Sequence, residues 1–202
     1  MDRTDLRIVK THLQIDQALL DCLKDYPFQK ITVDMLCKKA LINRSTFYKY
    51  YLDKYDLLDK FLDKILEEFR RNIQVDFVNA APSRIHDLCY IQSYESALKF
   101  IGSKKNDYEI LWNAVIDRQI FNEMTRIVHD KIMDTLRPMA RQTPVIEKYS
   151  ALYAHLFASN MMSLVLWWFE YYDQISMEEV EEIMADNMRL GLFKTFRKKM
   201  ES

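Results

Sequence analysis

Glycine and proline are scarce in this sequence: of its 202 residues only Gly102 and Gly191 are glycine, and four are proline. β-Sheet proteins use both residue types, and Asn-Gly pairs, in the tight turns between strands. Apolar residues make up 49% of the chain, which is ample for a packed core. The composition therefore predicts an all-α protein whose helices are joined by short connections.

Cysteine is also scarce. The three cysteines, Cys22, Cys37 and Cys89, are an odd number without C-x-x-C spacing, which indicates a reduced, cytoplasmic protein. The longest nearly apolar stretch, Met161–Phe169, is far shorter than the ~20 residues of a membrane-spanning helix. The first residues have no apolar run after their charges, so we expect neither a signal peptide nor a membrane anchor.

Signatures of catalysis and metal binding are missing as well. His86, His129 and His155 lack the spacings H-x-x-E and H-x-x-x-H, and the sequence has no G-x-S-x-G, H-E-x-x-H or glycine-rich phosphate loop. We therefore expect no metal site, no cofactor and no enzymatic activity. A helical enzyme in which an N-terminal binding module is vestigial stays open as an alternative.

Hydrophobic periodicity and capping residues predict about nine helices. Their expected spans are 6–23, 33–39, 44–50, 54–79, from the break at 80–83 to about 101, 108–118, 120–136, 145–172 and 177–199. Thr32 and Asn43 are expected to cap two of them, and Ser176 with Glu179 forms a capping box. The sequence GSKKND, Gly102–Asp107, is the strongest turn signal in the chain.

The two short helices expected at 33–39 and 44–50 are too short to be stable alone. A helix-turn-helix stabilises such a pair by packing it on a third helix, and it presents the second member to the DNA major groove. The expected packing residues are Leu19, Leu23, Leu36, Ala40, Ile42 and Phe47. The outward residues are rich in hydrogen-bond donors and free of acids, and residues 24–54 hold seven bases against three acids. This pattern favours binding to a polyanion.

The segment FQKITVDMLCKKALINRSTFYKYYLDKYDLL, Phe28–Leu58, resembles the DNA-binding region of the TetR family of transcriptional regulators. The resemblance covers roughly residues 6–65 and matches about a dozen positions in order. It implies a helix-turn-helix head at 1–52, joined by a helix at about 54–79 to a helical domain at 53–202 that binds an effector and dimerises. It further implies a homodimer that binds a double-stranded DNA operator and regulates transcription, with repression expected.

Family roles can be carried over to matching positions. The base-reading residues would be Arg44, Ser45 and Thr46, of which arginine can pair bidentately with guanine. The phosphate contacts would be Thr32, Tyr48, Tyr51 and Lys54, and Asn43 and Lys49 would lie in the same interface. For Tyr51 a buried core position is an equal alternative. The family usually has glycine where this chain has Leu41. A positive φ there would store roughly 1–2 kcal/mol of strain, and a turn of different geometry is the alternative.

The resemblance implies less about the C-terminal region. Expected pocket residues are Tyr90, Tyr94, Trp112, Phe121, Met124, Met133, Tyr153 and Trp167. Expected dimer contacts from the last two helices are Phe157, Met161, Leu164, Val165, Trp168, Phe169, Ile183, Met184 and Leu190. For all of these, ordinary core packing is the alternative. Parts of Tyr108–Pro138 are similar to a subgroup that includes activators of dihydroxyacetone operons, so an activator or adaptor controlled by a protein partner stays open.

Overall fold

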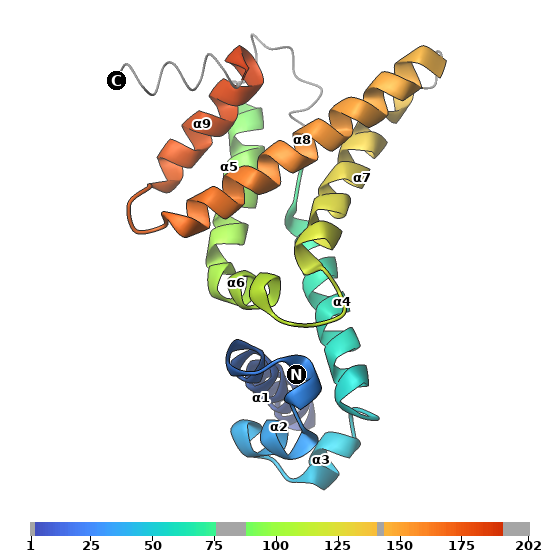
Figure 1. Cartoon of the computed structure of the whole chain (residues 1–202), viewed down its shortest axis with the longest axis vertical. Coiled ribbons are helices and arrows are strands. Elements are labelled where there is room, and N and C mark those ends of the chain that lie inside the picture. The colour runs from blue at the N-terminus through green and yellow to red at the C-terminus, as the bar shows by residue number, and fades with distance from the viewer. Residues whose placement is uncertain (1–2, 76–87, 141–143, 192–202) are drawn as a thin grey trace. The chain divides into compact units, whose positions relative to one another are not determined.

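The computed structural model describes residues 3–75, 88–140 and 144–191, and these residues form nine α-helices, one 3₁₀ helix and no strand (Figure 1). The elements are α1 (Arg3–Asp25), η1 (Phe28–Lys30), α2 (Val33–Ala40), α3 (Arg44–Tyr48), α4 (Lys54–Asn72), α5 (Leu88–Ser103), α6 (Lys105–Asn113), α7 (Ile120–Ala140), α8 (Pro144–Glu170) and α9 (Met177–Leu190). The predicted all-α class is confirmed. Within the described ranges, no helix has both the length and the hydropathy needed to cross a bilayer.

The chain divides into two compact units. The first, here called the head, comprises Met1–Glu68 and Asn106–Phe121, and the second, the body, comprises Phe69–Lys105 and Asn122–Ser202. This division does not follow the boundary at residue 52 that the sequence suggested. The reason is that residues 106–121 return to the head: the Phe28 amide donates to the Val115 carbonyl at 3.2 Å. Helix α4 contributes residues to both units.

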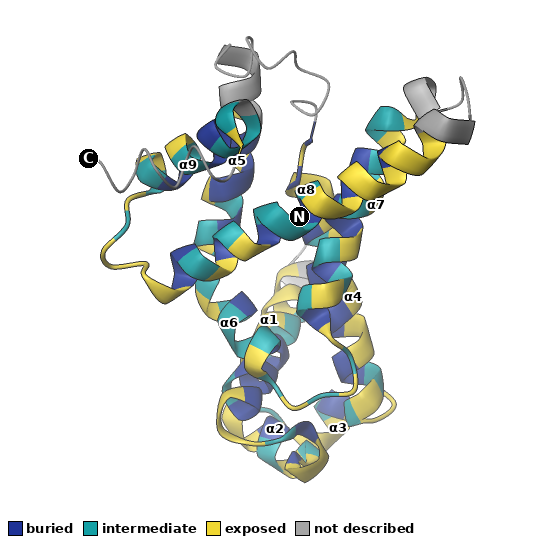
Figure 2. Cartoon of the chain, turned by 45° about the horizontal axis from the view of Figure 1, so that its top comes forward, coloured by how far each residue is buried: buried dark blue, intermediate teal, exposed yellow. Residues whose placement is uncertain are grey.

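The core of the head lies where α1 meets α2 and α3. Ile15 and Leu19 of α1 have no exposed surface, and neither do Leu36 of α2 and Phe47 of α3. Figure 2 shows the buried positions on the inner faces of these helices. Because α2 and α3 have only eight and five residues, this shared apolar contact is what stabilises them. The packing predicted for a helix-turn-helix is therefore present.

Capping residues fix where the short helices begin. Thr32 Oγ1 accepts a hydrogen bond from the Met35 amide at 3.2 Å, as predicted. Ser176 Oγ does the same for the Glu179 amide at the start of α9, at 3.2 Å. Asn43 occupies the N-cap position of α3, but its side chain makes no capping hydrogen bond there.

The start of α4 is held by two aspartates in a reciprocal arrangement. Asp53 Oδ1 accepts from the amides of Tyr55 and Asp56 at 2.8 and 2.9 Å. Asp56 Oδ2 accepts from the Leu52 amide at 3.0 Å. The Asp53 carboxylate thus satisfies two amides that the first turn of a helix leaves unpaired, and the Asp56 carboxylate fixes the residue that precedes Asp53. Hydrogen bonding from the Lys60 side chain and the Leu52 amide lowers the pKa of Asp56.

Helix α4 ends at Asn72, so the prediction of a helix to residue 79 is wrong for residues 73–75. Ile73 and Val75 are buried and Gln74 between them is exposed, which is the alternation of extended backbone. Residues 76–79, like the break expected at 80–83, lie outside the described ranges. The apolar residues that follow α4 therefore alternate with a period of two residues, whereas the prediction extended the helical period of 3.6 residues beyond Asn72.

The turn predicted at Gly102–Asp107 is reduced to a single residue. Helix α5 runs through Gly102 to Ser103, and α6 begins at Lys105. Gly102 serves another purpose: a Cβ placed on it would lie 2.9 Å from Cη2 of Trp168 in α8. This glycine therefore permits close helix packing and does not mark a turn.

Other helix ends also differ from the prediction. Helix α6 ends at Asn113 and not at 118, because the following segment bonds to the head through the Val115 carbonyl. Helix α7 continues past Pro138 to Ala140, and α8 ends at Glu170, two residues early. Helix α9 ends at Leu190, where Gly191 takes a φ of 82°. Residues 192–199, expected to be helical, lie outside the described ranges.

Candidate nucleic-acid interface

The turn between α2 and α3 has the geometry that the family resemblance suggested. Leu41 has φ 55° and ψ 42°, in the left-handed region, and among the described residues it is the only non-glycine with positive φ. The following amide, Ile42 N, bonds to the Cys37 carbonyl at 3.0 Å and so ends α2. The alternative of a different turn geometry is thus excluded. Leucine disfavours this conformation by roughly 1–2 kcal/mol relative to right-handed backbone.

Helix α3 presents the predicted contact residues on one side. Phe47 is fully buried, whereas Arg44, Ser45, Tyr48 and Lys49 are exposed. Thr46 is half-buried, and Asn43 is exposed at the N-cap. The helix itself ends at Tyr48 and not at residue 50. The exposed side holds guanidinium, ammonium and hydroxyl groups and no carboxylate, so it can donate hydrogen bonds to bases and phosphates.

Arg44 is held in place by two neighbours. Its Nη1 lies 3.2 Å from Asp34 Oδ1, and its Nη2 donates to the Tyr48 hydroxyl at 3.4 Å. The Tyr48 hydrogen bond, together with the charge of Asp34, raises the pKa of Arg44. The Arg44 and Asp34 side chains are 59% and 68% exposed, and exposed ion pairs contribute little stability. Arg44 can therefore exchange Asp34 for another acceptor at small cost.

Lys54 makes a different set of contacts from the predicted phosphate bond. Its Nζ donates to the carbonyls of Phe28 and Gln29, both at 3.0 Å, and to that of Ile31 at 2.8 Å. The ammonium also lies 4.8 Å from the centre of the Phe28 ring and 5.3 Å from that of Tyr55. Lysine has three ammonium protons, and all three have acceptors inside the head. The structure gives Lys54 the role of joining α4 to η1, and its phosphate contact stays a prediction.

Tyr51 lies in the core of the head. Its side chain is 6% exposed, and its hydroxyl is 2.8 Å from Nδ1 of His12 on α1. Its ring packs against Phe47 with the centroids 5.5 Å apart. Burial raises the pKa of Tyr51, with smaller contributions from Asp16 and Asp56. This geometry favours the buried alternative for Tyr51 over a direct contact with DNA.

A groove beside α3 was not predicted from the sequence. It is formed by the first half of α1 on one side and residues 41–50 on the other. Its lining residues are Arg7, Ile8, Lys10, Thr11, Gln14, Leu41, Ile42, Asn43, Thr46, Lys49 and Tyr50. The sequence did contain a pattern that could have predicted this groove. Arg7, Lys10 and Gln14 recur at spacings of three and four, which places three polar side chains on one side of the first half of α1.

The predicted pocket residues are divided between the two units. Trp112 and Phe121 belong to the head, where their rings contact each other at 5.3 Å between centroids. In the body, Met124 is fully buried and Tyr153 is 51% exposed. Met133 and Trp167 are half-buried, and the side chain of Tyr90 lies outside the described part.

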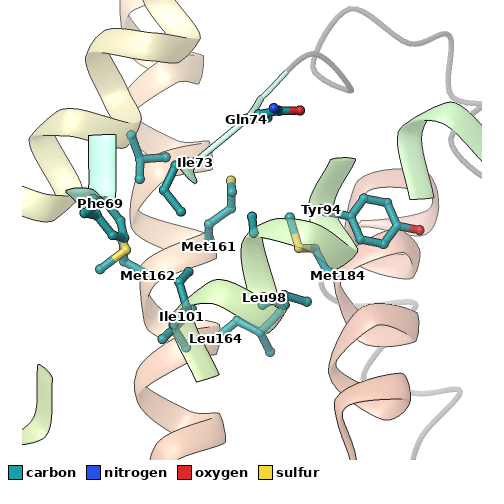
Figure 3. A pocket seen from close by; sticks show the side chains of 13 residues that line it. Phe69, Ile73, Gln74, Tyr94, Leu98, Ile101, Met161, Met162, Leu164 and Met184 are labelled. Carbon is teal, nitrogen blue, oxygen red and sulfur yellow. The ribbon is translucent and has the colours of Figure 1, made fainter. Parts of the chain in front are cut away.

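The described part of the body has an apolar void at the end of α4. Tyr94 is the one predicted pocket residue that lines it, and in Figure 3 its hydroxyl points away from the other labelled side chains. The further lining residues are Phe69, Ile73, Gln74, Ala97, Leu98, Ile101, Val128, Met161, Met162, Leu164, Val165 and Met184. The void has room for roughly one water.

The predicted dimer contacts are buried or half-buried within the body. Val165, Trp168, Phe169 and Met184 are at most 5% exposed. Phe157, Met161, Leu164, Ile183 and Leu190 are half-buried. Helix α8 instead exposes a different apolar stripe at helical spacing, which consists of Tyr149, Leu152, Tyr153 and Leu156, each at least 50% exposed. The sequence could not predict which side of α8 is buried, because apolar residues occur on every side of this helix.

Metal ligands do not gather in the described part of the chain: no group of three or more His, Cys, Asp or Glu side chains is arranged to hold an ion.

The fold and the exposed side of α3 define a helix-turn-helix protein, and comparisons with known proteins agree. No family model matches the sequence. A Bacillus subtilis (strain 168) protein, "Uncharacterized HTH-type transcriptional regulator YxbF", is 22% identical over 157 residues, which are 77% of this chain. The chain spans only 38% of the length of that relative.

A solved structure shares the fold. It is that of a Clostridium perfringens protein described as a "putative fatty acid metabolism regulator", with a TM-score of 0.62 and 18% sequence identity. The match covers 89% of this chain and 98% of the other. At this identity the likeness establishes the common helical fold alone.

Proposed function

We propose that this chain is a TetR-like, sequence-specific DNA-binding regulator of transcription and not an enzyme. The observation that carries the proposal is the exposed side of α3, whose residues donate hydrogen bonds and include no acid. The turn at Leu41 and the buried side chain of Phe47 fix the orientation of this helix. A helix in this setting is the element that helix-turn-helix proteins place in the major groove. The regulator names of the two similar proteins support the same interpretation.

Within this proposal the contact residues have separate roles. Arg44, Ser45 and Thr46 at the start of α3 would face base edges, and the planar guanidinium of Arg44 suits the O6 and N7 acceptors of guanine. Thr32, Tyr48 and Lys49 would contact phosphates. Thr32 Oγ1 already accepts from Met35 N, so its hydroxyl proton is the group that can donate to a phosphate. Asn43 lies beside Arg44 on the same exposed side.

The test is selection of binding sites in vitro. The full chain is incubated with random-sequence duplex DNA, bound duplexes are enriched, and one is measured by fluorescence anisotropy across a salt series. We expect an enriched motif and an affinity that falls linearly in a plot of log K against log salt concentration. Recovery of random sequences with no enrichment would contradict the proposal.

We further propose a homodimer formed through the exposed stripe of α8. Tyr149, Leu152, Tyr153 and Leu156 recur at spacings of three and four, so they lie on one side of the helix. Exposed apolar stripes of this kind mark association surfaces. A two-fold dimer would present two copies of α3, and DNA favours two such helices about 34–36 Å apart.

For the regulatory signal we propose a protein partner, and a small molecule stays open because the body also has an open pocket lined by Leu98, Gly102 and Trp168. The apolar void there holds roughly one water. A partner that alters the packing of Phe69, which lines the void, would act on the same helix, α4, that Lys54 ties to η1. We expect native mass spectrometry of protein purified from cells to give twice the mass of the unmodified chain, with no added ligand mass. A retained small-molecule adduct would instead favour an effector.

Repression is the sign of regulation that we propose, with activation by a partner as the second candidate. A reporter gene whose promoter contains the selected binding site distinguishes them. A repressor lowers expression of the reporter when the protein is present, and an activator raises it.

A further inference from the structure

The groove between α1 and the helix-turn-helix has an unusual combination of residues. Arg7 and Lys10 are exposed on the α1 wall, and Lys49 is exposed on the opposite wall. Thr11, Gln14 and Asn43 add neutral polar groups, and none of the lining residues is acidic. Lined by bases on both walls and directly beside α3, the groove is electrostatically complementary to a polyanion.

Leu41 lies at the rim of the same groove and is 85% exposed. Its left-handed backbone is a conformation that glycine or asparagine adopts at less cost than leucine. The leucine side chain is hardly buried in the fold, so its packing does not offset this cost. An apolar side chain at a strained and exposed position is therefore better explained by a contact with something outside the chain.

We propose that this groove is a second DNA-binding surface, next to the bases read by α3. Arg7, Lys10 and Lys49 contact phosphates of one strand, and Leu41 packs against the apolar edge of a nucleotide, either the deoxyribose or the 5-methyl group of a thymine. This inference rests on the proposed DNA-binding function. It adds an α1 surface and an apolar contact to the hydrogen-bonding residues of α3.

The sharpest test is Leu41→Gly, because this variant should bind DNA more weakly without becoming less stable. Relief of backbone strain should leave the melting temperature unchanged or raise it by about 2–4 °C. Loss of the apolar contact should weaken binding to the selected duplex by about 5- to 10-fold. Leu41→Asn, which also tolerates this backbone, should behave in the same way. Unchanged affinity in both variants would overturn the role of Leu41.

The two possible apolar targets are separated by changing the DNA. Deoxyuridine lacks the 5-methyl group of thymidine, so each thymidine of the selected duplex is replaced in turn. If Leu41 contacts a methyl group, one replacement weakens the wild-type protein and has no further effect on Leu41→Gly. If Leu41 contacts a sugar, each replacement changes the affinity of the wild type and of Leu41→Gly by the same factor, so the ratio of their affinities stays constant.

The basic residues are tested by the salt dependence. Lys10→Gln should lower the slope of log K against log salt by about 0.9 for each phosphate that the protein no longer neutralises, with little change in sequence preference. Lys24→Gln is the matched control, since Lys24 is exposed on the same helix, about 21 Å further along it, and does not line the groove. Equal slopes for the wild type and Lys10→Gln would overturn the groove contact.

The outcomes separate the two proposals. If the wild-type chain enriches no DNA sequence, the proposed function fails. If it binds a selected duplex while the Leu41 and Lys10 variants bind like the wild type, only the groove fails.

Discussion

The six-membered ring of Trp168 lies against Gly102, so that a Cβ at residue 102 would be 2.9 Å from the indole Cη2 atom. Trp168 is 3% exposed, and the centroids of its ring and the Tyr172 ring are 5.5 Å apart. Replacing glycine by alanine inside a helix ordinarily stabilises it by about 1 kcal/mol. At this position the sign should reverse.

We expect Gly102→Ala to lower the free energy of unfolding by about 1–3 kcal/mol, because the added methyl group overpacks the contact with Trp168. Thermal unfolding followed by circular dichroism measures the change. Ser96→Ala, at an exposed position of the same helix, should be neutral or slightly stabilising. Stabilisation by Gly102→Ala would mean that the indole moves freely.

Lys54→Met should destabilise the head by about 2–3 kcal/mol, because three backbone carbonyls lose their common donor. Chemical denaturation, monitored by fluorescence, gives the difference. Lys30→Met is the control, since Lys30 is exposed at the end of η1. A loss of DNA affinity with unchanged stability would instead assign Lys54 to the phosphate contact that the sequence predicted.

Glu181 should make the stability of the body depend on pH. Its Oε1 has no hydrogen-bond partner among the described residues, and burial, with the nearby Glu95 and Glu178, raises its pKa while Lys99 opposes the shift. A carboxyl with a raised pKa in the folded state binds its proton more tightly there than in the unfolded chain. Its favourable contribution is therefore complete below its ordinary pKa of 4.5 and is lost as the pH rises through the raised value.

Glu181→Gln removes this titration. We expect the variant to melt at a higher temperature than the wild type at pH 7, by a few degrees, and at nearly the same temperature at pH 4. Glu170→Gln, exposed at the end of α8, is the control and should show no such difference. An equal shift at both pH values would trace the effect to packing and not to the proton.

Leu156→Arg should separate the proposed dimer into monomers, because it places a charge in the apolar stripe of α8. Sedimentation velocity measures the mass. Val115→Arg, at an exposed apolar residue of the head, should leave the dimer intact. If Leu156→Arg sediments like the wild type, the stripe is not the interface.

Arg44→Ala should relax sequence preference at one base position of each half-site and cost ~1–3 kcal/mol of binding free energy there. Binding to duplexes that vary at single positions shows which base is affected. Asp34→Asn tests the exposed ion pair: it should leave the preference intact, since Asp34 positions Arg44 without contacting DNA in this proposal. A uniform loss across all duplexes would make Arg44 a phosphate contact.

The sequence was most informative where local chemistry decides the structure. Thr32 was expected to cap α2 and does, and the positive φ at Leu41 follows from the glycine of the resembling family. Each of the nine expected helices has a counterpart, although several ends differ. These features depend on a few neighbouring residues, which a single sequence displays directly.

Features that depend on distant residues were missed. The acceptors of Lys54 lie 23 to 26 residues earlier in the chain, and their closeness arises only when η1 folds against α4. Gly102 resembled a turn residue until Trp168 was placed beside it. In α8 apolar residues cover the whole circumference, so periodicity could not separate the buried Trp168 from the exposed Leu156.

The contacts of Lys54 have a consequence for the way in which the head comes apart. One ammonium group holds carbonyls of η1 and of the following Ile31 to the first turn of α4, while Asp53 and Asp56 close that turn. If this turn frays, the segment that precedes α2 is released at the same time. Hydrogen exchange should therefore reveal a single cooperative opening, in which amides of α2, η1 and the start of α4 exchange together.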